Sequence, residues 1–316
     1  MTIDPHRFAD WVSGEAREAL AGDSTVPPPG ASIEVLRQHY GRFCEHRLAQ
    51  SRTAYPVAIA EVERAGVPCH LVEPAGGARH AGQLICLHGG AFMWGAGAGA
   101  LLEAVPVAAV SGMRVIAVEY RLAPEHCFPA AVEDVVAVYR HLLADGSAAR
   151  LGIYGCSAGA ALTAQAVARM IRDRLPVPGG IAMLHAAGLE LAGDSAMTAP
   201  LFQPSPATAA PSFATMPYFS STTPDDPLAM PGNHPDLLRH FPPALLVTAT
   251  RDFAASSVSV MHRRLLAAGV EAEFMLFDGM GHAHHMATTL PESRETFAAL
   301  ARFFARVLEQ PEALRS

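Results

Sequence analysis

A serine lies between two glycines in the segment Gly155-Cys156-Ser157-Ala158-Gly159. An apolar run at residues 151–154 precedes this segment, and an alanine-rich stretch follows it. On a strand–turn–helix, such a serine is lifted above the sheet, and the glycines avoid collision with the turn. The helix start supplies N–H groups and a positive dipole end that suit a developing oxyanion. The motif predicts Ser157 as a nucleophile; a tight turn with a buried serine is the structural alternative.

Adjacent glycines follow an earlier apolar run, in His88-Gly89-Gly90-Ala91. Without side chains, such glycines let backbone N–H groups turn toward a ligand. In acyl transfer that ligand is the oxyanion of the tetrahedral intermediate. A flexible glycine loop is the alternative, because further glycines follow at positions 95, 97 and 99. His88 precedes the glycines at the strand end, so we expect it to fix the loop by hydrogen bonds rather than act as a base.

An activated serine also needs an acid and a histidine, here in the chain order Ser, Asp or Glu, His. Asp252 follows the apolar run 245–248, and His282 follows the run 273–277. Both lie at the carboxyl ends of expected strands, where open α/β sheets carry their sites. The acid would hold the imidazole in the correct tautomer. Asp278 competes for this role, but four residues before His282 it is expected to shape the turn.

His282, His284 and His285 form an H-x-H-H cluster that could also indicate a metal site. Catalytic zinc is usually held by three protein ligands, often including a carboxylate. The sequence offers no second cluster, so we expect neither a metal nor another cofactor. His284 and His285 are expected in a loop or at the rim of a pocket.

Short apolar runs alternate along the chain with longer stretches of helical periodicity. Runs that are apolar throughout and separated by helices predict a mostly parallel sheet covered on both faces. A hairpin is expected over residues 57–63 and 67–72, because these segments alternate around a central glycine. We expect further strands at residues 84–87, 115–118, 151–154, 181–184, 245–248 and 273–277. Helices are expected at residues 129–143, 158–174, 254–268 and 291–308.

The first 55 residues carry two amphipathic helical patterns, at residues 8–20 and 33–48, separated by a proline-rich break. Each apolar stripe must cover something, either the core or a pocket as a lid. The segment 195–235 is rich in Pro, Ser, Thr and Ala, and it is too long for an ordinary connection. We therefore expect a helical cap over residues 1–55, with a contribution from about 195–235, and a catalytic domain over residues 56–316.

Composition excludes several classes of protein. The 316 residues are 50% hydrophobic and only 17% charged, with a net charge of −7, which is the reverse of a disordered chain. A pI of about 6.1 without a basic cluster argues against a nucleic-acid partner. The charge-free stretches 81–102 and 195–224 are interrupted by glycines or prolines, so no membrane span is expected. Charged residues occupy the place of a signal-peptide core, which favours a cytoplasmic protein. Five cysteines without a CxxC pair favour reduced thiols.

With these residues assembled, the chain resembles the hormone-sensitive-lipase-like family of α/β-hydrolases, the bacterial carboxylesterases. The resemblance covers roughly residues 70–310, and the ordered set of motifs is far more specific than any one of them. The matching segments are His88-Gly89-Gly90, Tyr120-Arg121-Leu122-Ala123-Pro124-Glu125, Phe128-Pro129-Ala130, the Ser157 turn, Asp252 and Gly279-Met280-Gly281-His282.

The resemblance implies an α/β-hydrolase fold with an N-terminal helical cap. It also implies Ser157 as nucleophile, His282 as base and Asp252 as acid, with an oxyanion hole from the N–H groups of Gly89, Gly90 and Ala158. Small-molecule esters with short to medium acyl chains are the implied substrates, and many members form homodimers. The chain departs from the family at Ala91, where a third glycine is usual, and at Cys156, where an aspartate is usual. These departures are expected to narrow the oxyanion hole and to remove a charge beside the nucleophile.

The sequence therefore predicts a serine carboxylesterase that works through an acyl-enzyme on Ser157. An apolar pocket would receive the acyl chain, and its candidate wall residues are Trp11, Phe92, Trp94, Phe202, Met216 and Tyr218. One alternative is a lactone hydrolase with the same triad. Another is a non-catalytic ligand-binding protein on a hydrolase scaffold, because fold alone does not establish function.

Overall fold

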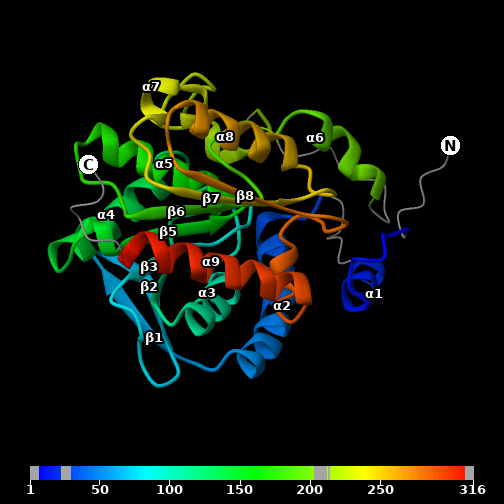
Figure 1. The fold of residues 1–316 in the computed structure, drawn as a ribbon. Helices are drawn as coiled ribbons and strands as arrows, with labels where there is room; N and C mark the ends of the chain where they lie inside the picture. Colours follow the sequence, from blue (N-terminus) through cyan, green and yellow to red (C-terminus); the bar gives the residue numbers. More distant parts are fainter. Residues whose placement is uncertain (1–6, 23–29, 203–211, 213, 310–316) are drawn as a thin grey trace.

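The computed structural model describes residues 7–22, 30–202, 212 and 214–309, and its centre is a twisted sheet of eight strands in that part of the chain (Figure 1). The strand order is β1-β2-β4-β3-β5-β6-β7-β8. Strand β2 runs antiparallel to both of its neighbours, and all the other pairs from β4 to β8 are parallel. The prediction of a mostly parallel sheet is therefore confirmed.

All eight predicted strands form, and their ends extend the apolar runs by one or two residues. Strands β3 to β7 are almost fully buried, and such continuous apolar runs give a strong local signal. Strands β1 and β2 instead show the alternation of a hairpin. The bounds are β1 Val57–Arg64, β2 Val67–Pro74, β3 Gln83–Leu87, β4 Arg114–Val118, β5 Leu151–Cys156, β6 Gly180–Leu184, β7 Ala244–Ala249 and β8 Ala272–Phe277.

Helices cover both faces of the sheet, and each face has its own apolar cluster. On one face, α4 (Ala130–Ala144), α5 (Ala158–Arg172) and α8 (Ala255–Ala267) pack against alternate strand residues such as Ile85 and Leu87. On the other face, α3 (Ala98–Ser111) and α9 (Pro291–Glu309) pack against residues such as Leu84 and Cys86. This alternation follows from the two-residue period of a strand.

Helix α3 has no counterpart among the predicted elements. Its segment carries a glycine-rich start, an internal proline at Pro106 and almost no charge, and most of its residues are buried. A helix that is apolar all round shows no polar stripe and therefore no amphipathic period. Only its first five residues lie in the charge-free stretch 81–102, and the remaining residues carry no helical period that would indicate a helix.

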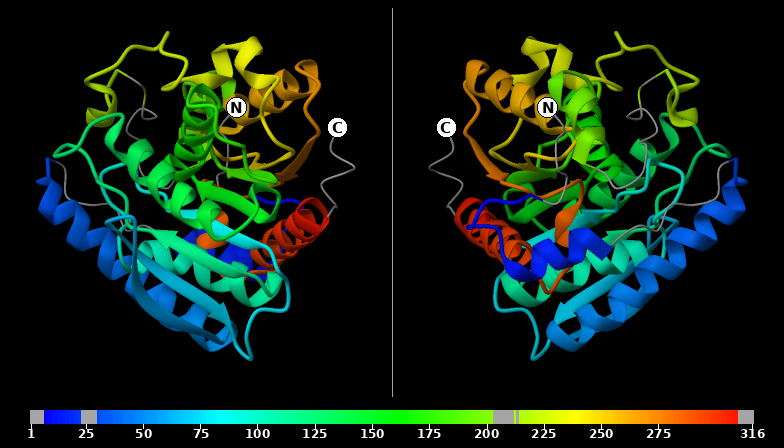
Figure 2. Two further views of the ribbon diagram at one scale, coloured as in Figure 1. Left: turned by 90° about the vertical axis from the view of Figure 1, so that its left-hand side faces the viewer. Right: turned by 90° about the vertical axis from the view of Figure 1, so that its right-hand side faces the viewer.

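The N-terminal region forms α1 (Gly14–Gly22) and α2 (Ile33–Ala54), which lie on the same side of the sheet as α3 and α9 (Figures 1 and 2). The first helix is shorter than predicted: residues 8–13 contain a turn in which the Val12 N–H donates to the Ala9 carbonyl at 3.1 Å. Ser32 caps the N-terminus of α2. Cys44 of α2 packs against Leu102 of α3.

The segment after β6 is largely irregular. It contains α6 (Asp194–Thr198), α7 (Pro235–Leu238) and three 3-10 helices, Ala199–Phe202, Pro217–Phe219 and Pro231–Asn233. Two more 3-10 helices lie at Ala148–Arg150 and His284–Met286. Residues 203–211 and 213, which belong to the predicted cap contribution 195–235, lie outside the described residues.

Two observations bear on the predicted class of protein. No helix in the described parts of the chain combines the length and the hydropathy that crossing a membrane requires. All five cysteines are free thiols, and four of them are buried.

Candidate active site

Ser157 occupies the sharp turn between β5 and α5. Its backbone has φ 54° and ψ −118°, a strained conformation for a residue with a side chain. The flanking glycines are required by close backbone contacts: a Cβ at Gly159 would lie 1.8 Å from the Leu87 carbonyl oxygen, and one at Gly155 would lie 2.4 Å from the Gly159 carbonyl carbon. The predicted nucleophile turn is therefore present, and it raises the Ser157 hydroxyl above the carboxyl edge of the sheet.

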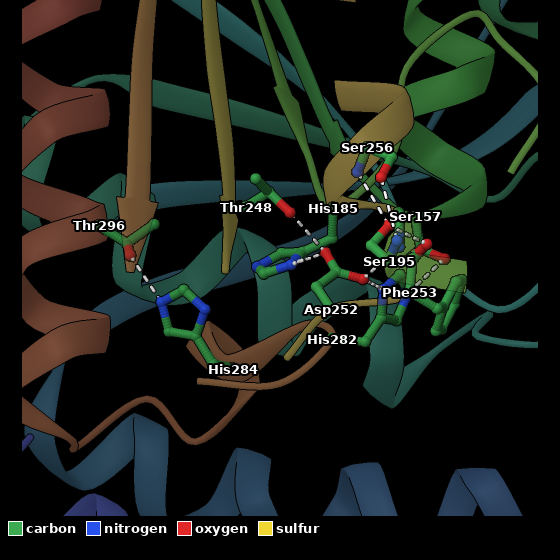
Figure 3. Close-up of polar contacts among 11 residues, drawn as sticks. Ser157, His185, Ser195, Thr248, Asp252, Phe253, Ser256, His282, His284 and Thr296 are labelled. Carbon is green, nitrogen blue, oxygen red and sulfur yellow. Dashed lines mark hydrogen bonds and ion pairs between the residues drawn. The ribbon is translucent and has the colours of Figure 1, made fainter. Parts of the chain in front are cut away.

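Ser157, His282 and Asp252 form a continuous line of hydrogen bonds (Figure 3). Ser157 Oγ lies 2.9 Å from His282 Nε2, and His282 Nδ1 lies 2.7 Å from Asp252 Oδ1. An ionised carboxylate only accepts, so His282 Nδ1 carries the proton and Nε2 is free to accept from the serine hydroxyl. The three residues come from the ends of β5, β7 and β8, and the fold brings them together across 125 residues of chain.

The carboxylate of Asp252 is fully buried and accepts four hydrogen bonds. Oδ1 accepts from His282 and from the Ala254 N–H at 2.9 Å. Oδ2 accepts from His185 Nδ1 at 2.7 Å and from Thr248 Oγ1 at 2.8 Å. Burial opposes the negative charge, but the neighbouring histidines outweigh it, so the pKa of Asp252 lies far below its ordinary value. Asp252 is thus a fixed anion at neutral pH.

Asp278, the competing candidate for the acid, lies elsewhere. Its carboxylate is exposed and accepts hydrogen bonds from Trp11 Nε1 at 2.9 Å and from Thr250 Oγ1 at 3.1 Å. These contacts join the turn after β8 to the loop after β7 and to the N-terminal region. Asp278 therefore shapes the turn, as predicted.

His185 was not singled out by the sequence, yet it contacts the same carboxylate as His282. It follows β6, has a positive φ of 59° and is completely buried. Burial lowers the pKa of His185 even beside Asp252, so the ring is neutral. A histidine directly after a predicted strand at the same sheet edge as Asp252 was the available signal, but its partner is 67 residues away in the chain.

His284 and His285 are buried beside His185, which corrects the prediction that they lie in a loop or at the rim of a pocket. Only 6% and 3% of their surfaces are exposed, because the 3-10 helix turns them inward against α9. The His284 ring lies 5.0 Å from that of His185, and its Nε2 lies 3.1 Å from Thr296 Oγ1 (Figure 3). Burial and the neighbouring imidazoles lower the pKa of both residues well below the ordinary value, so both rings are neutral.

The region after β7 is also tied to the segment after β6. Ser195 Oγ donates to the Phe253 carbonyl at 2.8 Å and accepts from the Ser256 N–H at 2.9 Å (Figure 3). The Phe253 ring stacks on the His282 ring with centroids 4.1 Å apart. These contacts fix the wall beside the His282 imidazole.

His88 fixes the loop after β3 by a hydrogen bond and by ring stacking, as predicted. This histidine is completely buried, its Nδ1 lies 2.8 Å from the Gly89 carbonyl oxygen, and its ring stacks on Tyr120. Tyr120 Oη donates to the His88 carbonyl at 2.7 Å. At Gly90, with φ 121°, a Cβ would lie 2.0 Å from the Trp94 carbonyl oxygen, so only glycine fits there.

The Gly89 N–H donates to Glu103 Oε1 at 2.7 Å. This bond contradicts the predicted role of Gly89 as an oxyanion donor, because its N–H is occupied within the protein. Glu103 comes from α3 and is 3% exposed. Burial raises the pKa of its carboxyl to about 8, although the Gly89 N–H opposes the rise. Because α3 was not predicted, the sequence offered no reason to bring Glu103 beneath this loop.

A small apolar pocket opens at Ser157. Its lining is dominated by small and apolar side chains, with Gln165 and Glu190 as polar members. Gln165 is completely buried and fixed, because its Nε2 donates to the Ala229 carbonyl and its Oε1 accepts from Tyr218 Oη. The residues around the pocket are Ala91, Phe92, Ser157, Ala158, Ala161, Gln165, Ala186, Ala187, Leu189, Glu190, Leu191, Met216, Phe219, Ala229 and Met230.

Of the six predicted wall residues, Phe92 and Met216 line this pocket. Tyr218 is completely buried behind the wall and stacks on Phe92 at 3.8 Å.

The other three predictions are wrong, because each side chain packs elsewhere. Trp11 is 79% exposed and bonds Asp278. Trp94 faces Tyr40 of α2, and Phe202 lies under the Arg251 guanidinium.

Among the described residues, two groups of three potential metal ligands occur, and within each group the ligand atoms lie within 4.8 Å of one another. One group is His185, Asp252 and His282, in which the Nδ1 atoms and the carboxylate are already joined by the hydrogen bonds above. His185 Nε2 is buried and has no hydrogen-bond partner among the described residues. The other is Glu103, Cys156 and His285. Burial and nearby Glu103 raise the pKa of Cys156 well above its ordinary value, and Glu103 is occupied by Gly89. The Cys156 thiol and the Glu103 carboxyl are thus both protonated, and a metal ion would have to displace their protons in order to bind.

Comparison with known proteins places this geometry in a family. The profile described as the alpha/beta hydrolase fold matches residues 84–286. LipR of Mycobacterium tuberculosis is 33% identical over 267 residues, which cover 80% of this chain and 82% of LipR. A protein named acetyl-hydrolase from Streptomyces hygroscopicus is 31% identical over 223 residues, 70% of this chain and 74% of the relative.

Solved structures agree with the sequence relatives. An esterase from the bacterial hormone-sensitive lipase family has a TM-score of 0.79 and 27% identity, covering 90% of this chain and 94% of that one. A hormone-sensitive lipase from a metagenome library has a TM-score of 0.79 and 26% identity, covering 98% and 99%. The chain belongs to the α/β-hydrolase fold family, in its bacterial hormone-sensitive-lipase-like group.

Proposed function

We propose that the protein is a serine carboxylesterase that hydrolyses small esters with short to medium acyl chains. The observation that carries this proposal is the hydrogen-bonded line Ser157–His282–Asp252 at the mouth of an apolar pocket. Relatives named acetyl-hydrolase and esterase support ester substrates.

In the proposed reaction, His282 Nε2 takes the proton of Ser157 as Oγ forms a bond to the ester carbonyl carbon. The tetrahedral intermediate collapses when the bond to the alcohol oxygen breaks, and the alcohol leaves with the proton from His282. Water then attacks the acyl carbon while His282 takes a proton from it. The bond between that carbon and Ser157 Oγ breaks, His282 returns the proton to Oγ, and the acid is released. Asp252 stabilises the imidazolium in both steps.

The oxyanion in this proposal is held by backbone N–H groups of the loop after β3 and of the turn. Gly90 and Ala158 keep their predicted roles. Ala91 is the candidate to replace Gly89, because it lines the pocket beside Ser157 and its positive φ of 52° turns the loop backbone. Removal of one such donor typically costs on the order of 100- to 1000-fold in kcat.

A chain-length series of p-nitrophenyl esters tests the proposal. We expect a maximum at short to medium acyl chains for the wild type and a loss of at least about 1000-fold in kcat for Ser157→Ala. A fluorophosphonate should label the wild type and leave S157A unlabelled. Unchanged hydrolysis by S157A would overturn the proposal, and a preference for long, insoluble esters would overturn the chain-length assignment.

A further inference from the structure

We propose that His185 is a positioning residue of the catalytic site, acting through Asp252 so that the hydrogen-bonded unit is Ser157–His282–Asp252–His185. The inference rests on the proposed function and extends it to a residue that neither the motifs nor the family comparison singled out. Figure 3 shows the two imidazoles on opposite oxygens of one carboxylate.

The direction of the hydrogen bond follows from the atoms involved. Asp252 Oδ2 lies 2.7 Å from His185 Nδ1, and a carboxylate oxygen can only accept. His185 Nδ1 therefore carries the proton, and both side chains are completely buried. Because the pair is buried, water does not compete for the His185 N–H, and the short bond holds Oδ2 in place. The rotation of the Asp252 carboxylate is then fixed, with Oδ1 facing His282.

The same bond draws negative charge from the carboxylate. His282 and His185 compete for the electrons of one anion, with both distances at 2.7 Å. A donor on Oδ2 weakens the stabilisation that Oδ1 can give to the His282 imidazolium. Removal of the His185 donor should therefore make His282 a stronger base while leaving Asp252 less firmly oriented.

Aromatic rings and further histidines surround the pair His185–Asp252. The Phe253 ring stacks on His282 without carrying charge. His284 and His285 pack against His185 with ring centroids at 5.0 and 5.6 Å, and both are neutral. The remaining titratable neighbours of the site, which the substitutions below leave in place, are Cys156 and Glu103 beneath the turn and Glu190 at the pocket.

His185→Asn and His185→Leu form a matched pair for the test. The two replacements have nearly the same branched shape, but only the Asn amide nitrogen occupies the place of Nδ1 as a donor. Asn also tolerates the positive φ of 59° at this position better than Leu does, so the pH profile and T248V, rather than kcat alone, separate loss of the donor from backbone strain. We expect H185N to keep kcat/KM within about 3-fold of the wild type. We expect H185L to lose about 10- to 100-fold in kcat with little change in KM, because His185 does not line the pocket.

The pH profile separates positioning from packing. In H185L the acidic limb of kcat/KM should move to higher pH by about half a unit or more, while in H185N it should stay within about 0.2 units of the wild type. Thr248→Val removes the other donor to Oδ2 in an isosteric replacement, and it should move the limb in the same direction. T248V also keeps the test decisive if the His185 variants do not fold.

His262→Leu provides a control for the loss of a partly buried histidine outside the site. Its ring stacks on Phe274 and its Nε2 faces the Ala272 carbonyl, so kcat and the pH profile should be unchanged. The inference would be overturned if H185N and H185L lost equal activity and the acidic limb of their kcat/KM profiles did not move. It would also be overturned if the acidic limb did not move in T248V. In either case, fluorophosphonate labelling of wild-type Ser157 would still uphold the proposed function. A wild type that is neither active nor labelled would overturn the proposed function and the inference with it.

Discussion

Glu103 is a carboxyl group buried in the core beneath the turn that carries Ser157, and its charge state couples the stability of the fold to pH. The pKa of about 8, set by burial, means that the folded protein holds a proton that the unfolded chain releases above 4.5. The folded state therefore binds more protons than the unfolded state in this window, and the free energy of unfolding falls as the pH rises. The neutral carboxyl still accepts the Gly89 N–H through its carbonyl oxygen.

Glu103→Gln tests this linkage. The amide oxygen can accept the same N–H, so activity should stay within about 3-fold of the wild type. Between 4.5 and about 8, the free energy of unfolding of the wild type should fall relative to that of E103Q by up to about 1.4 kcal/mol per pH unit. Urea denaturation at several pH values measures both proteins. Parallel stability curves would show that Glu103 is ionised in the folded protein.

At the scale of elements, helix α5 combines two tasks. Its first turn presents Ser157 and Ala158, and further along the same face Ala161 and Gln165 line the pocket. Residues three and four positions apart share a helix face, so the spacing of these side chains follows from the period. The small side chain of Ala161 leaves space beside the nucleophile, and the fixed amide of Gln165 closes the pocket further in.

Ala161→Leu should therefore shorten the acceptable acyl chain. Leucine is nearly as good a helix former as alanine, so the helix should persist while the pocket loses volume. We expect kcat/KM for hexanoate esters to fall at least about 10-fold relative to acetate esters, since longer chains need the lost depth. Ala49→Leu, at an exposed position of α2, is the control. An equal loss of kcat/KM on every ester would show that Ala161 does not contact the acyl chain.

Much of the element scale could be predicted from sequence, and the exceptions have physical causes. Strands β3 to β8 could be predicted because each is an apolar run in the sequence. The Ser157 turn could be predicted because its local geometry requires the two glycines. The pairing of His185 with Asp252 and of Glu103 with Gly89 depends on contacts between distant segments, which no local pattern encodes. Large apolar side chains in charge-poor segments predict a pocket wall only in general terms, because tertiary packing decides that Trp11 is exposed and that Tyr218 lies behind Phe92.

At the scale of the whole molecule, Arg37 joins the N-terminal helices to the catalytic core. Its guanidinium donates to the Met93 carbonyl at 2.8 Å and to the Ala123 carbonyl at 3.0 Å, and it pairs with Glu125. Met93 belongs to the same loop as Gly90. We propose that α1 and α2 form the predicted cap, and that Arg37 transmits their position to the oxyanion loop.

Arg37→Ala should loosen this connection. Loss of the two carbonyl contacts should lower the melting temperature by about 2–4 °C and kcat/KM by roughly 3- to 10-fold. Glu125→Gln keeps the carbonyl contacts and removes only an exposed ion pair, so its effect should be much smaller. Thermal melts and ester kinetics compare the two. Equal effects of Arg37→Ala and Glu125→Gln would show that the ion pair, and not the two carbonyl contacts, connects α2 to the core.

The strand order has a consequence for the protein during its synthesis. Ser157, His185, Asp252 and His282 follow four strands, β5 to β8, that are consecutive both in the chain and in the sheet. Under the proposed mechanism, a nascent chain that ends before β8 already carries the Ser157 nucleophile but lacks its base, His282. Such a polypeptide would not turn over esters, or be trapped by a phosphonate, until β8 and the following His282 had left the ribosome and β8 had joined the sheet edge.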